Sequence, residues 1–395
     1  MPRRSRSASS GTDPRRPGCR DPRPSCHARR MTSDAATPDH ARDAGPLITV
    51  VIPLHDRGRY IAETLQGVLA QGFRRLEVIV VDDASTDDGP EVVQGFLSDP
   101  RLTLVLRTHG GVAAARNAGA ALAADSSEYL LFMDDDDVAA PDLLESLLAA
   151  LQAHPEACGA FARAEFIDSD GGPVHPGAFR DQMIGRERLG LADGATSGPY
   201  RGLDQVFLAT PVVPMGTLLV RRAAFEATGG FDPTFVVGQD WEFTIRLVRQ
   251  APLVLVDRAL VAYRRHSGNA SANRVRDIQT ARRVWATAYH SPDNSREDAA
   301  LLASVWRRHQ RRTAVRKVAQ GRAMLRQRHV VSGLGRIADG MAHRLLRRPP
   351  RIWRRPVPGS SRPATQTTIA IRRGPLGARS DRPRDIRETA SDTGS

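Results

Sequence analysis

The chain has 395 residues and a net charge of +13, and 41% of its residues are hydrophobic. This length fits one large domain or two modest ones. The charge is unevenly divided: residues 46–275 hold 20 Arg and 30 acidic residues, whereas residues 276–395 hold 27 basic and 9 acidic residues. An acidic centre between basic ends excludes a uniformly basic nucleic-acid-binding domain.

Cysteine usage and hydropathy indicate the compartment. The three cysteines form no CxxC pair, so neither a disulfide framework nor a structural zinc site is expected. No apolar run reaches the roughly 18 residues that span a bilayer, and the N-terminal stretch lacks the apolar centre of a secretory signal. We expect a cytoplasmic protein. Residues 1–45 are expected to be a disordered basic tail, with Met31 as an alternative start.

From Leu47 onward, short β-branched apolar runs alternate with helical patterns. Strands are predicted at residues 48–54, 76–81, 102–106, 129–133, 157–168, 216–221 and 253–256. Helices are predicted at residues 60–69, 88–98, 111–124, 141–154, 223–228 and 239–250, and residues 169–212 are loop-like. This alternation predicts an α/β domain over residues 46–275, with a mostly parallel sheet flanked by helices. An Arg-rich helical extension over residues 276–348 and a disordered tail over 349–395 are expected to follow.

Polar side chains follow three of the predicted strands at the point where each ends: His55-Asp56-Arg57, Asp82-Asp83 and Asp134–Asp137. In an open parallel sheet, ligands bind at the carboxyl ends of the strands. We therefore expect these three segments to form one site.

The four aspartates Asp134–Asp137 repel one another, and Mg²⁺ or Mn²⁺ would offset that repulsion. A solvated acidic loop, or Asp137 capping a nearby helix, is the alternative. Asp82-Asp83 could accept hydrogen bonds from a nucleotide base or ribose, or could simply form a turn.

Three further residues have both a functional and a structural interpretation. Arg116, in a glycine-led helix, could pair with a carboxylate or phosphate, or could be a surface residue. Asp240 could be a general base beside Trp241, or could only favour a helix N-terminus, a role that Glu242 fits equally well. His266, in a loop, is by itself more often a solvated residue.

Taken in order, these motifs resemble the inverting family 2 glycosyltransferases, which have the GT-A fold of nucleotide-diphospho-sugar transferases. The resemblance covers about residues 47–271. It is carried by the segments Val50–Leu54, Glu63–Gln71, Leu76–Asp87, Gly111–Gly119, Phe132–Asp137, Gly229–Asp232, Gln239–Glu242 and Tyr263–His266.

The resemblance also implies roles for individual residues. Asp240 matches the family's general base. Asp134 and Asp136 match its D-x-D motif, which holds Mn²⁺ or Mg²⁺ on the donor diphosphate, and His266 matches a position near the metal. The implied nucleotide-binding residues are Pro53, His55, Asp83, Arg116, Asp134 and Asp135.

The implied activity is transfer of a sugar, with inversion, from a UDP-, GDP- or dTDP-sugar to the hydroxyl of a glycan or lipid-linked acceptor. The Q-x-x-R-W signature of processive synthases is absent from the sequence, which favours addition of single sugars. The alternatives are a sugar-phosphate nucleotidyltransferase and a non-catalytic protein that binds membrane surfaces.

The helical extension places Arg residues among apolar ones, as in Val305–Arg312. Basic amphipathic helices of this kind bind anionic membranes, so a peripheral position at the inner face of the membrane is expected. An ordinary packed helix with a solvated Arg-rich face is the alternative, and nucleic acid is not expected as a partner.

Overall fold

The computed structural model describes residues 45–174, 199–200, 203–207, 212–269, 274–345, 349 and 370–373. By their contacts, Ala41–Ser395 group into one unit, separate from Met1–His40. The disordered tail expected at the N-terminus lies outside the described residues, apart from residue 45. So does most of the loop-like segment 169–212.

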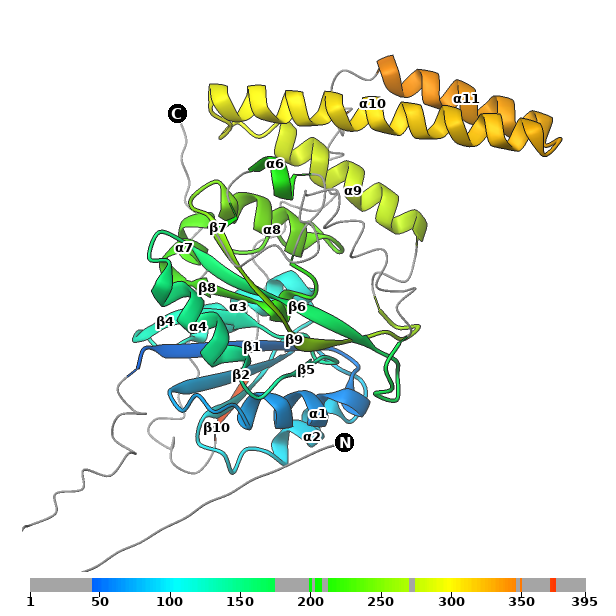
Figure 1. Ribbon diagram of the computed structural model, residues 1–395. Coiled ribbons are helices and arrows are strands. Elements are labelled where there is room, and N and C mark those ends of the chain that lie inside the picture. Colours follow the sequence, from blue (N-terminus) through cyan, green and yellow to red (C-terminus); the bar gives the residue numbers. More distant parts are fainter. Residues whose placement is uncertain are drawn as a thin grey trace, which may run out of the picture. The chain divides into compact units, whose positions relative to one another are not determined.

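The first part of the described chain alternates strands and helices, as the apolar runs predict (Figure 1). The strands are β1 (Leu47–Leu54), β2 (Leu76–Asp82), β3 (Leu102–Leu106), β4 (Ser127–Phe132), β5 (Val138–Ala139) and β6 (Gly159–Ile167). The helices between them are α1 (Gly58–Leu69), α2 (Gly89–Gln94), α3 (Val112–Leu122) and α4 (Leu143–Ala153).

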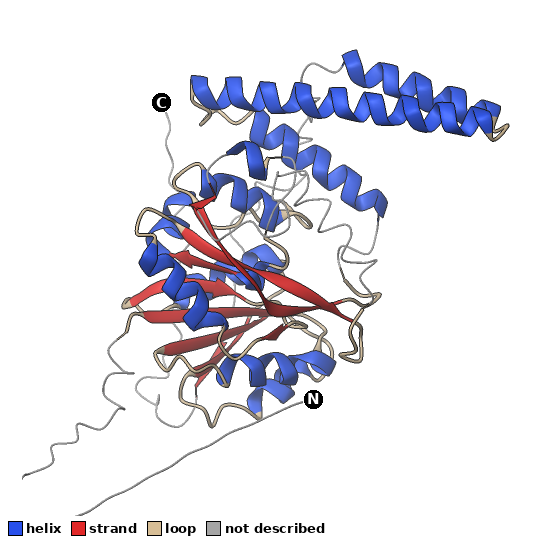
Figure 2. Cartoon of the chain, viewed as in Figure 1, coloured by secondary structure: helices blue, strands red, loops and turns tan. Residues whose placement is uncertain are grey.

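The second part adds further strands and most of the helical mass (Figure 2). Its elements are β7 (Pro199–Tyr200), α6 (Leu203–Val206), a 3₁₀ turn (Met215–Thr217), β8 (Leu218–Arg221), α7 (Arg222–Thr228), α8 (Gln239–Val248) and β9 (Leu253–Arg264). The last elements are α9 (Arg274–Tyr289), α10 (Arg296–Arg326), α11 (Val330–Leu345) and β10 (Ala370–Arg373).

One mixed sheet holds the described strands in the order β10-β3-β2-β1-β4-β8-β6-β9-β5, and β7 pairs with β9. Strands β3, β2, β1 and β4 are parallel to one another, and β6 is parallel to β9. Strand β8 runs antiparallel to both β4 and β6. The chain leaves β1 toward β2 and β3 on one side and then crosses to β4 on the other side. In open α/β sheets, ligands bind outside the carboxyl ends of the strands at such a reversal, which here lies between β1 and β4.

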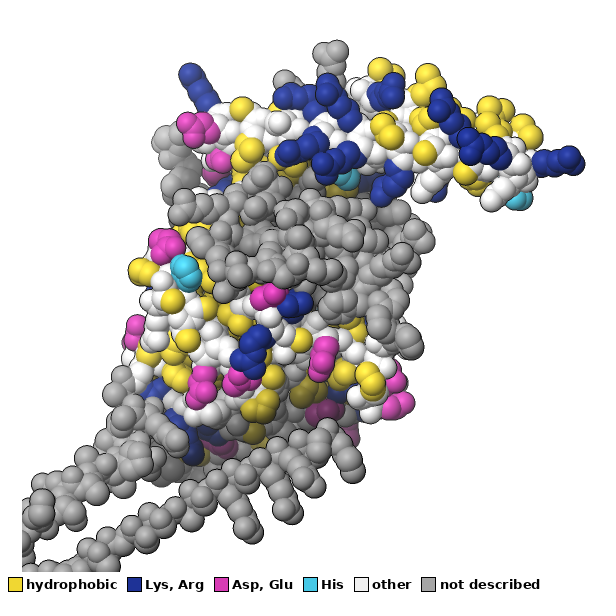
Figure 3. Space-filling view, in the orientation of Figure 1, with side chains coloured by type: hydrophobic (Ala, Val, Ile, Leu, Met, Phe, Trp, Pro, Cys, Tyr) yellow, Lys and Arg dark blue, Asp and Glu magenta, His cyan; other side chains and the backbone are white. Residues whose placement is uncertain are grey.

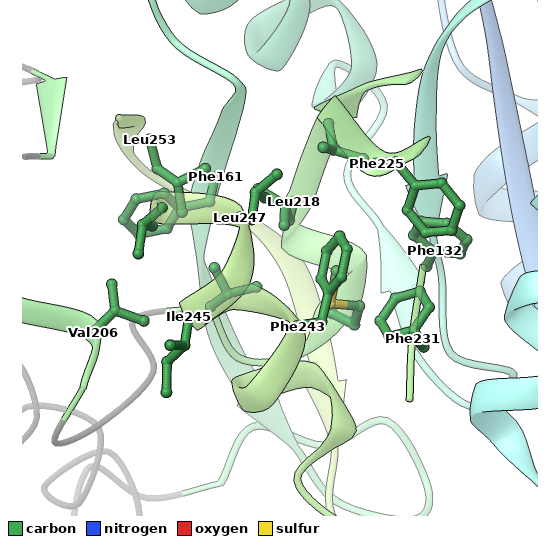
Figure 4. Close-up of a cluster of buried hydrophobic side chains, with 14 of the residues drawn as sticks. Phe132, Phe161, Val206, Leu218, Phe225, Phe231, Phe243, Ile245, Leu247 and Leu253 are labelled. Atoms are coloured by element: carbon green, nitrogen blue, oxygen red, sulfur yellow. The ribbon is translucent and has the colours of Figure 1, made fainter. Parts of the chain in front are cut away.

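Each face of the sheet carries its own apolar core, because successive strand residues point to opposite faces. Val51 and Phe132 face a cluster built with α3, α7, α8 and α10, whereas Val50 and Leu131 face a cluster built with α1, α2 and α4. Figure 4 shows the centre of the first cluster, where aromatic rings of Phe132, Phe231 and Phe243 gather. The Phe231 and Phe243 ring centroids lie 4.5 Å apart.

The structure differs from the sequence expectations in several places. Strand β5 is not among those expected, and β7 and α6 lie within the segment 169–212 expected to be loop-like. The helix expected at 88–98 ends at Gln94, and the strand expected at 253–256 continues to Arg264. The tail expected to be disordered from residue 349 contains β10, which pairs antiparallel with β3. A segment of four residues such as Ala370–Arg373 gives no strand signal of its own, because its pairing depends on an open edge elsewhere in the sheet. In the part of the chain that is described, no helix is both long and apolar enough to cross a bilayer.

Candidate functional site

The three polar segments predicted at the strand ends do converge. The backbone N–H of His55, after β1, donates a hydrogen bond to Asp135 Oδ2, after β4, over 3.0 Å. The N–H of Thr86, after β2, donates to Asp56 Oδ1 over 2.7 Å, which lowers the pKa of Asp56. The predicted grouping at the carboxyl edge is therefore confirmed.

Asp83, after β2, is buried and surrounded by donors. Its carboxylate accepts hydrogen bonds from Arg107 Nη1 and from the backbone N–H groups of Gly110 and Gly111. The His109 ring lies 3.0 Å from Asp83 Oδ2, and its centroid is 4.7 Å from that of His55. Asp83 therefore fixes the loop before α3 and holds the His109 ring, which lies close to the His55 ring.

Arg116 of α3 is buried, so its interpretation as a surface residue is wrong. Its Nη2 donates a hydrogen bond to Asp134 Oδ1, and its guanidinium carbon lies 5.3 Å from the centroid of the Phe231 ring. Its Nε and Nη1 have no partner within the described part of the chain. Arg116 is thus a buried cation beside the acidic loop that follows β4.

Asp240 lies in the first turn of α8, close enough to Arg116 and Asp134 to be influenced by both charges. Burial raises the pKa of Asp240 above the ordinary carboxylate value, and the positive charge of Arg116 opposes that rise. Its Oδ1 accepts a hydrogen bond from the Trp241 N–H over 2.8 Å. By sequence, Glu242 fits a role at the helix N-terminus as well as Asp240 does. In the structure, Glu242 forms an ion pair with Arg246 one turn later.

Asp136 is 6% exposed and meets His266, whose Nε2 lies 2.8 Å from Asp136 Oδ2. Arg57 Nε lies 3.6 Å from the same oxygen. The His266 side chain is 8% exposed and its ring stacks on Tyr60 with centroids 5.0 Å apart. The interpretation of His266 as a solvated loop residue is therefore wrong.

The acidic quartet is electrostatically strained. Burial, followed by repulsion from Asp136, raises the pKa values of Asp135 and Asp137 well above the usual range. Burial, followed by repulsion from Asp134, raises the pKa of Asp136. These shifts fit the presence of a divalent cation, which would stabilise the charged carboxylates. Among the described residues, no three His, Cys, Asp or Glu side chains are grouped as a ready metal site.

Asp137 has a structural role that differs from both alternatives of the sequence. It is fully buried, so the loop is not simply solvated, and its Oδ1 accepts a hydrogen bond from the Arg264 N–H over 3.0 Å. Helix α4 begins later, at Leu143, and its N-cap is Asp142. Asp137 therefore ties the acidic loop to β9 rather than capping a helix.

Arg264 is a site residue to which the sequence assigned no role. Its side chain is 2% exposed, its Nε donates to the Asp136 carbonyl over 2.9 Å and its Nη2 donates to Glu63 Oε2 over 2.6 Å. The guanidinium also lies over the Tyr60 ring.

Arg107 is a second site residue that the sequence analysis did not single out, although it directly follows β3 and could have been found by the same strand-end signal. Pro53 lies buried inside β1, paired with Val81.

Comparison with known proteins shows similarity to one family over part of the chain. Residues 49–228 match the family model described as "Glycosyl transferase family 2". This part of the chain resembles that family. Glycosyltransferase GlyG of Streptococcus pneumoniae serotype 4 is 34% identical to it over 108 residues, which cover 27% of this chain and 35% of that relative. The chain spans well under two thirds of the length of the first curated relatives it matches, from 14% to 41%.

Solved structures show that the chain has the GT-A fold. The TarS 1–349 structure of S. aureus, in complex with UDP-GlcNAc, aligns with a TM-score of 0.51 and 21% identity, over 67% of this chain and 72% of that one. The mannosyltransferase PcManGT of Pyrobaculum calidifontis, in complex with GDP-Man and Mn²⁺, aligns with a TM-score of 0.51 and 20% identity, over 76% and 75% of the two chains. At these identities the likeness concerns the fold alone.

Proposed function

We propose that the protein transfers a single sugar from a nucleotide-diphosphate sugar to an acceptor hydroxyl, with inversion at the anomeric carbon. The observation that carries the proposal is the convergence of Asp240, Arg116 and Asp134 at the carboxyl edge of the sheet. The similarity of residues 49–228 to the glycosyltransferase family model favours this activity over the nucleotidyltransferase and the non-catalytic alternatives.

Asp240 is the proposed general base. An acceptor hydroxyl is a weak nucleophile, and an ionised Asp240 would take its proton as the hydroxyl oxygen attacks the anomeric carbon. The bond from that carbon to the diphosphate oxygen breaks in the same step, so a single displacement inverts the configuration. A base with a raised pKa is better matched to neutral pH than an ordinary aspartate.

Asp136, His266 and Asp134 are the proposed ligands of Mn²⁺ or Mg²⁺. Carboxylate oxygens and an imidazole nitrogen suit these ions, and the strained quartet favours a cation. A bound ion would stabilise the negative charge that develops on the departing nucleoside diphosphate. In this chain, Arg264 and Arg57 hold the Asp136 backbone and carboxylate in place.

The donor is proposed to bind at the carboxyl ends of β1 and β4. His55 and His109, whose ring centroids lie 4.7 Å apart, are proposed with Asp83 to contact the base and ribose. TarS, with UDP-GlcNAc, and PcManGT, with GDP-Man and Mn²⁺, share the fold and support a nucleotide sugar as donor. The proposed acceptor is a glycan or a lipid-linked saccharide, which would suit a peripheral membrane location.

A ligand screen on the full-length chain tests the proposal. Thermal unfolding is followed with UDP-, GDP- and dTDP-sugars, each with Mn²⁺ and with EDTA. A ligand that binds only the native state at 100 times its Kd adds about 2.7 kcal/mol of stability, so a true donor raises the Tm clearly. If no nucleotide sugar moves the transition under either condition, the proposal fails.

Two variants then test the assigned roles once a donor is known. Asp240→Asn should lower kcat by about 10²- to 10⁴-fold while donor binding persists. Glu242→Gln is the matched control, because Glu242 lies in the same helical turn and also favours its N-terminus. An equal loss of kcat in both variants would show that Asp240 acts only through the helix. Asp136→Ala should abolish the Mn²⁺ dependence of donor binding.

A further inference from the structure

Helices α10 and α11 pack as an antiparallel hairpin (Figure 1), and glycines hold them close together. A Cβ added at Gly321 would lie 2.6 Å from the Gly333 carbonyl oxygen, and one at Gly340 would lie 3.0 Å from the Ala314 oxygen. These contacts allow neither helix to rotate or slide freely against the other. The hairpin therefore presents defined faces.

Helix α11 carries an exposed apolar stripe. Its members are Val330, Val331, Leu334, Met341 and Leu345, with exposed fractions between 54% and 86%. At 3.6 residues per turn, these five positions fall within an arc of about 100°, beside the arc of Gly333, Ile337 and Gly340 that packs on α10. Seven of the eight exposed large hydrophobic residues in the described part of the chain lie on this hairpin.

Helix α10 carries a basic strip on the same side of the hairpin. Arg308, Arg311, Arg312, Arg322 and Arg326 are exposed and fall within another arc of about 100°. This arc lies about 90° from the surface that packs on α11. Because the helices run in opposite directions, the basic strip and the apolar stripe both face the same way. Figure 3 shows Lys and Arg side chains interspersed with hydrophobic ones along the hairpin.

The combined face points away from the rest of the unit. Helix α10 buries Leu302, Val305 and Trp306 in the core cluster shared with α8, and the centre of their arc lies about 120° from that of the basic strip. Residues 296–345 hold 12 basic and 3 acidic residues. One of those acids, Asp339, is already paired with Lys317. The face thus combines exposed apolar area with uncompensated positive charge.

We propose that this face of the α10–α11 hairpin binds the surface of an anionic lipid bilayer. The apolar stripe, about 22 Å long, would enter the boundary between headgroups and acyl chains. The Arg strip beside it would contact lipid phosphates. This inference goes beyond the proposed transferase activity and does not depend on it, since binding requires neither donor nor acceptor.

Charge and apolarity together favour a bilayer over other occupants. A second copy of the chain would bring two Arg-rich faces together, and like charges repel. Nucleic acid would satisfy the Arg residues but would leave the aliphatic stripe in water. A bilayer with anionic lipid offers an apolar interior to the aliphatic stripe and negatively charged headgroups to the Arg strip.

Co-sedimentation of the full-length protein with vesicles tests the proposal. Vesicles of phosphatidylcholine with about one third phosphatidylglycerol should bind the protein at low ionic strength, and binding should weaken as salt is added. Pure phosphatidylcholine vesicles should bind it far more weakly. The same titration with duplex RNA and duplex DNA measures the nucleic-acid alternative. Absence of binding to the anionic vesicles at low salt, or tighter binding to a nucleic acid than to vesicles, overturns the proposal.

Matched variants assign the binding to the face. Arg311→Gln with Arg322→Gln should weaken vesicle binding about 30-fold, since each cation near an anionic surface contributes about fivefold. Arg316→Gln with Arg336→Gln removes the same charge at positions outside the basic strip and the apolar stripe, and should change binding less than about threefold. Equal losses in both pairs would show that net charge alone is responsible and would contradict the proposal.

A second pair of variants tests the apolar stripe. Leu334→Ser and Met341→Ser should each weaken binding about tenfold, and both residues are exposed, so folding is not at risk. Val236→Ser, at a residue that is 76% exposed outside the hairpin, is the control. Unchanged binding in both stripe variants contradicts insertion. A protein that sediments as a dimer, and that Leu334→Ser converts to a monomer, would identify a second copy as the occupant instead.

Discussion

Arg116 in α3 and Asp134 after β4 are joined by a hydrogen bond from the Arg116 Nη2 to the Asp134 Oδ1. Arg116 is 3% exposed, and its charge also acts on Asp240 at the start of α8. One buried cation therefore influences both the acidic loop, with its proposed metal ligands, and the proposed base. This arrangement makes the protonation of Asp240 sensitive to changes at Arg116.

The pH profile of transfer should report this coupling. Asp240 must be ionised to act as a base, so its raised pKa places the acid limb of kcat/KM above the usual carboxylate range. Arg116→Gln removes the charge that opposes the rise, and the limb should move to still higher pH. Arg116→Lys keeps the charge and should restore most of the original profile. If the acid limb stays at the same pH in Arg116→Gln, the charge of Arg116 does not influence the protonation of the base.

Metal stabilisation should grow with pH. The pKa values of Asp135, Asp136 and Asp137 are raised in the folded state, so stability present at low pH is lost as pH rises through those values. A cation bound to the ionised carboxylates offsets that loss. The Tm difference between Mn²⁺ and EDTA should therefore be larger at pH 8 than at pH 5.

Asp136→Asn should remove most of this Mn²⁺ effect. Asp142→Asn is its control, because Asp142 follows the quartet closely but pairs with Arg258, which lowers the pKa of Asp142. A Mn²⁺ effect that is the same at both pH values, or that persists in Asp136→Asn, would exclude the quartet as its origin.

Arg264 should hold the acidic loop and β9 together. Arg264→Met removes hydrogen bonds to the Asp136 carbonyl and to Glu63 from a nearly solvent-free position, and should cost about 3 kcal/mol of unfolding free energy. Its neighbour Arg265 is exposed, and Arg265→Gln should stay within about 0.5 kcal/mol. Urea unfolding of both variants measures the difference. Similar values for the two would show that burial of Arg264 has no energetic consequence.

Two glycine substitutions should have opposite signs. A Cβ at Gly119 would collide with Val51 Cγ1, so Gly119→Ala should destabilise the unit by about 1–3 kcal/mol through the packing of α3 on β1. Gly335, inside α11, has nothing within 4 Å of its Cβ position, and Gly335→Ala should stabilise by about 0.5–1 kcal/mol. Thermal unfolding tests both signs. Stabilisation by Gly119→Ala would show that α3 can move away from the sheet.

The main strands could be predicted because each is a local signal. Ile48–Leu54 and Leu76–Val81 are β-branched runs of strand length, and burial on both faces of a parallel sheet favours such runs. Strand β10 could not be predicted in this way, because its hydrogen bonds come from β3, more than 260 residues earlier. The edge that it covers exists only after the sheet has formed.

The sequence by itself determined which candidate residues the chain carries: an acidic quartet, a strand-end Asp83 and an aspartate at a helix start, in an order that resembles one family. It left the partners of Arg116, Asp137 and His266 open, because one residue in isolation fits a surface as well as a site. Only the tertiary structure decided them. It buried Arg116 against Asp134, assigned Asp137 to Arg264 and brought His266 to Asp136 from 130 residues away. These contacts join residues that are far apart in the sequence. They form because the chain crosses from one side of β1 to β4 on the other side, and no local pattern encodes that crossing.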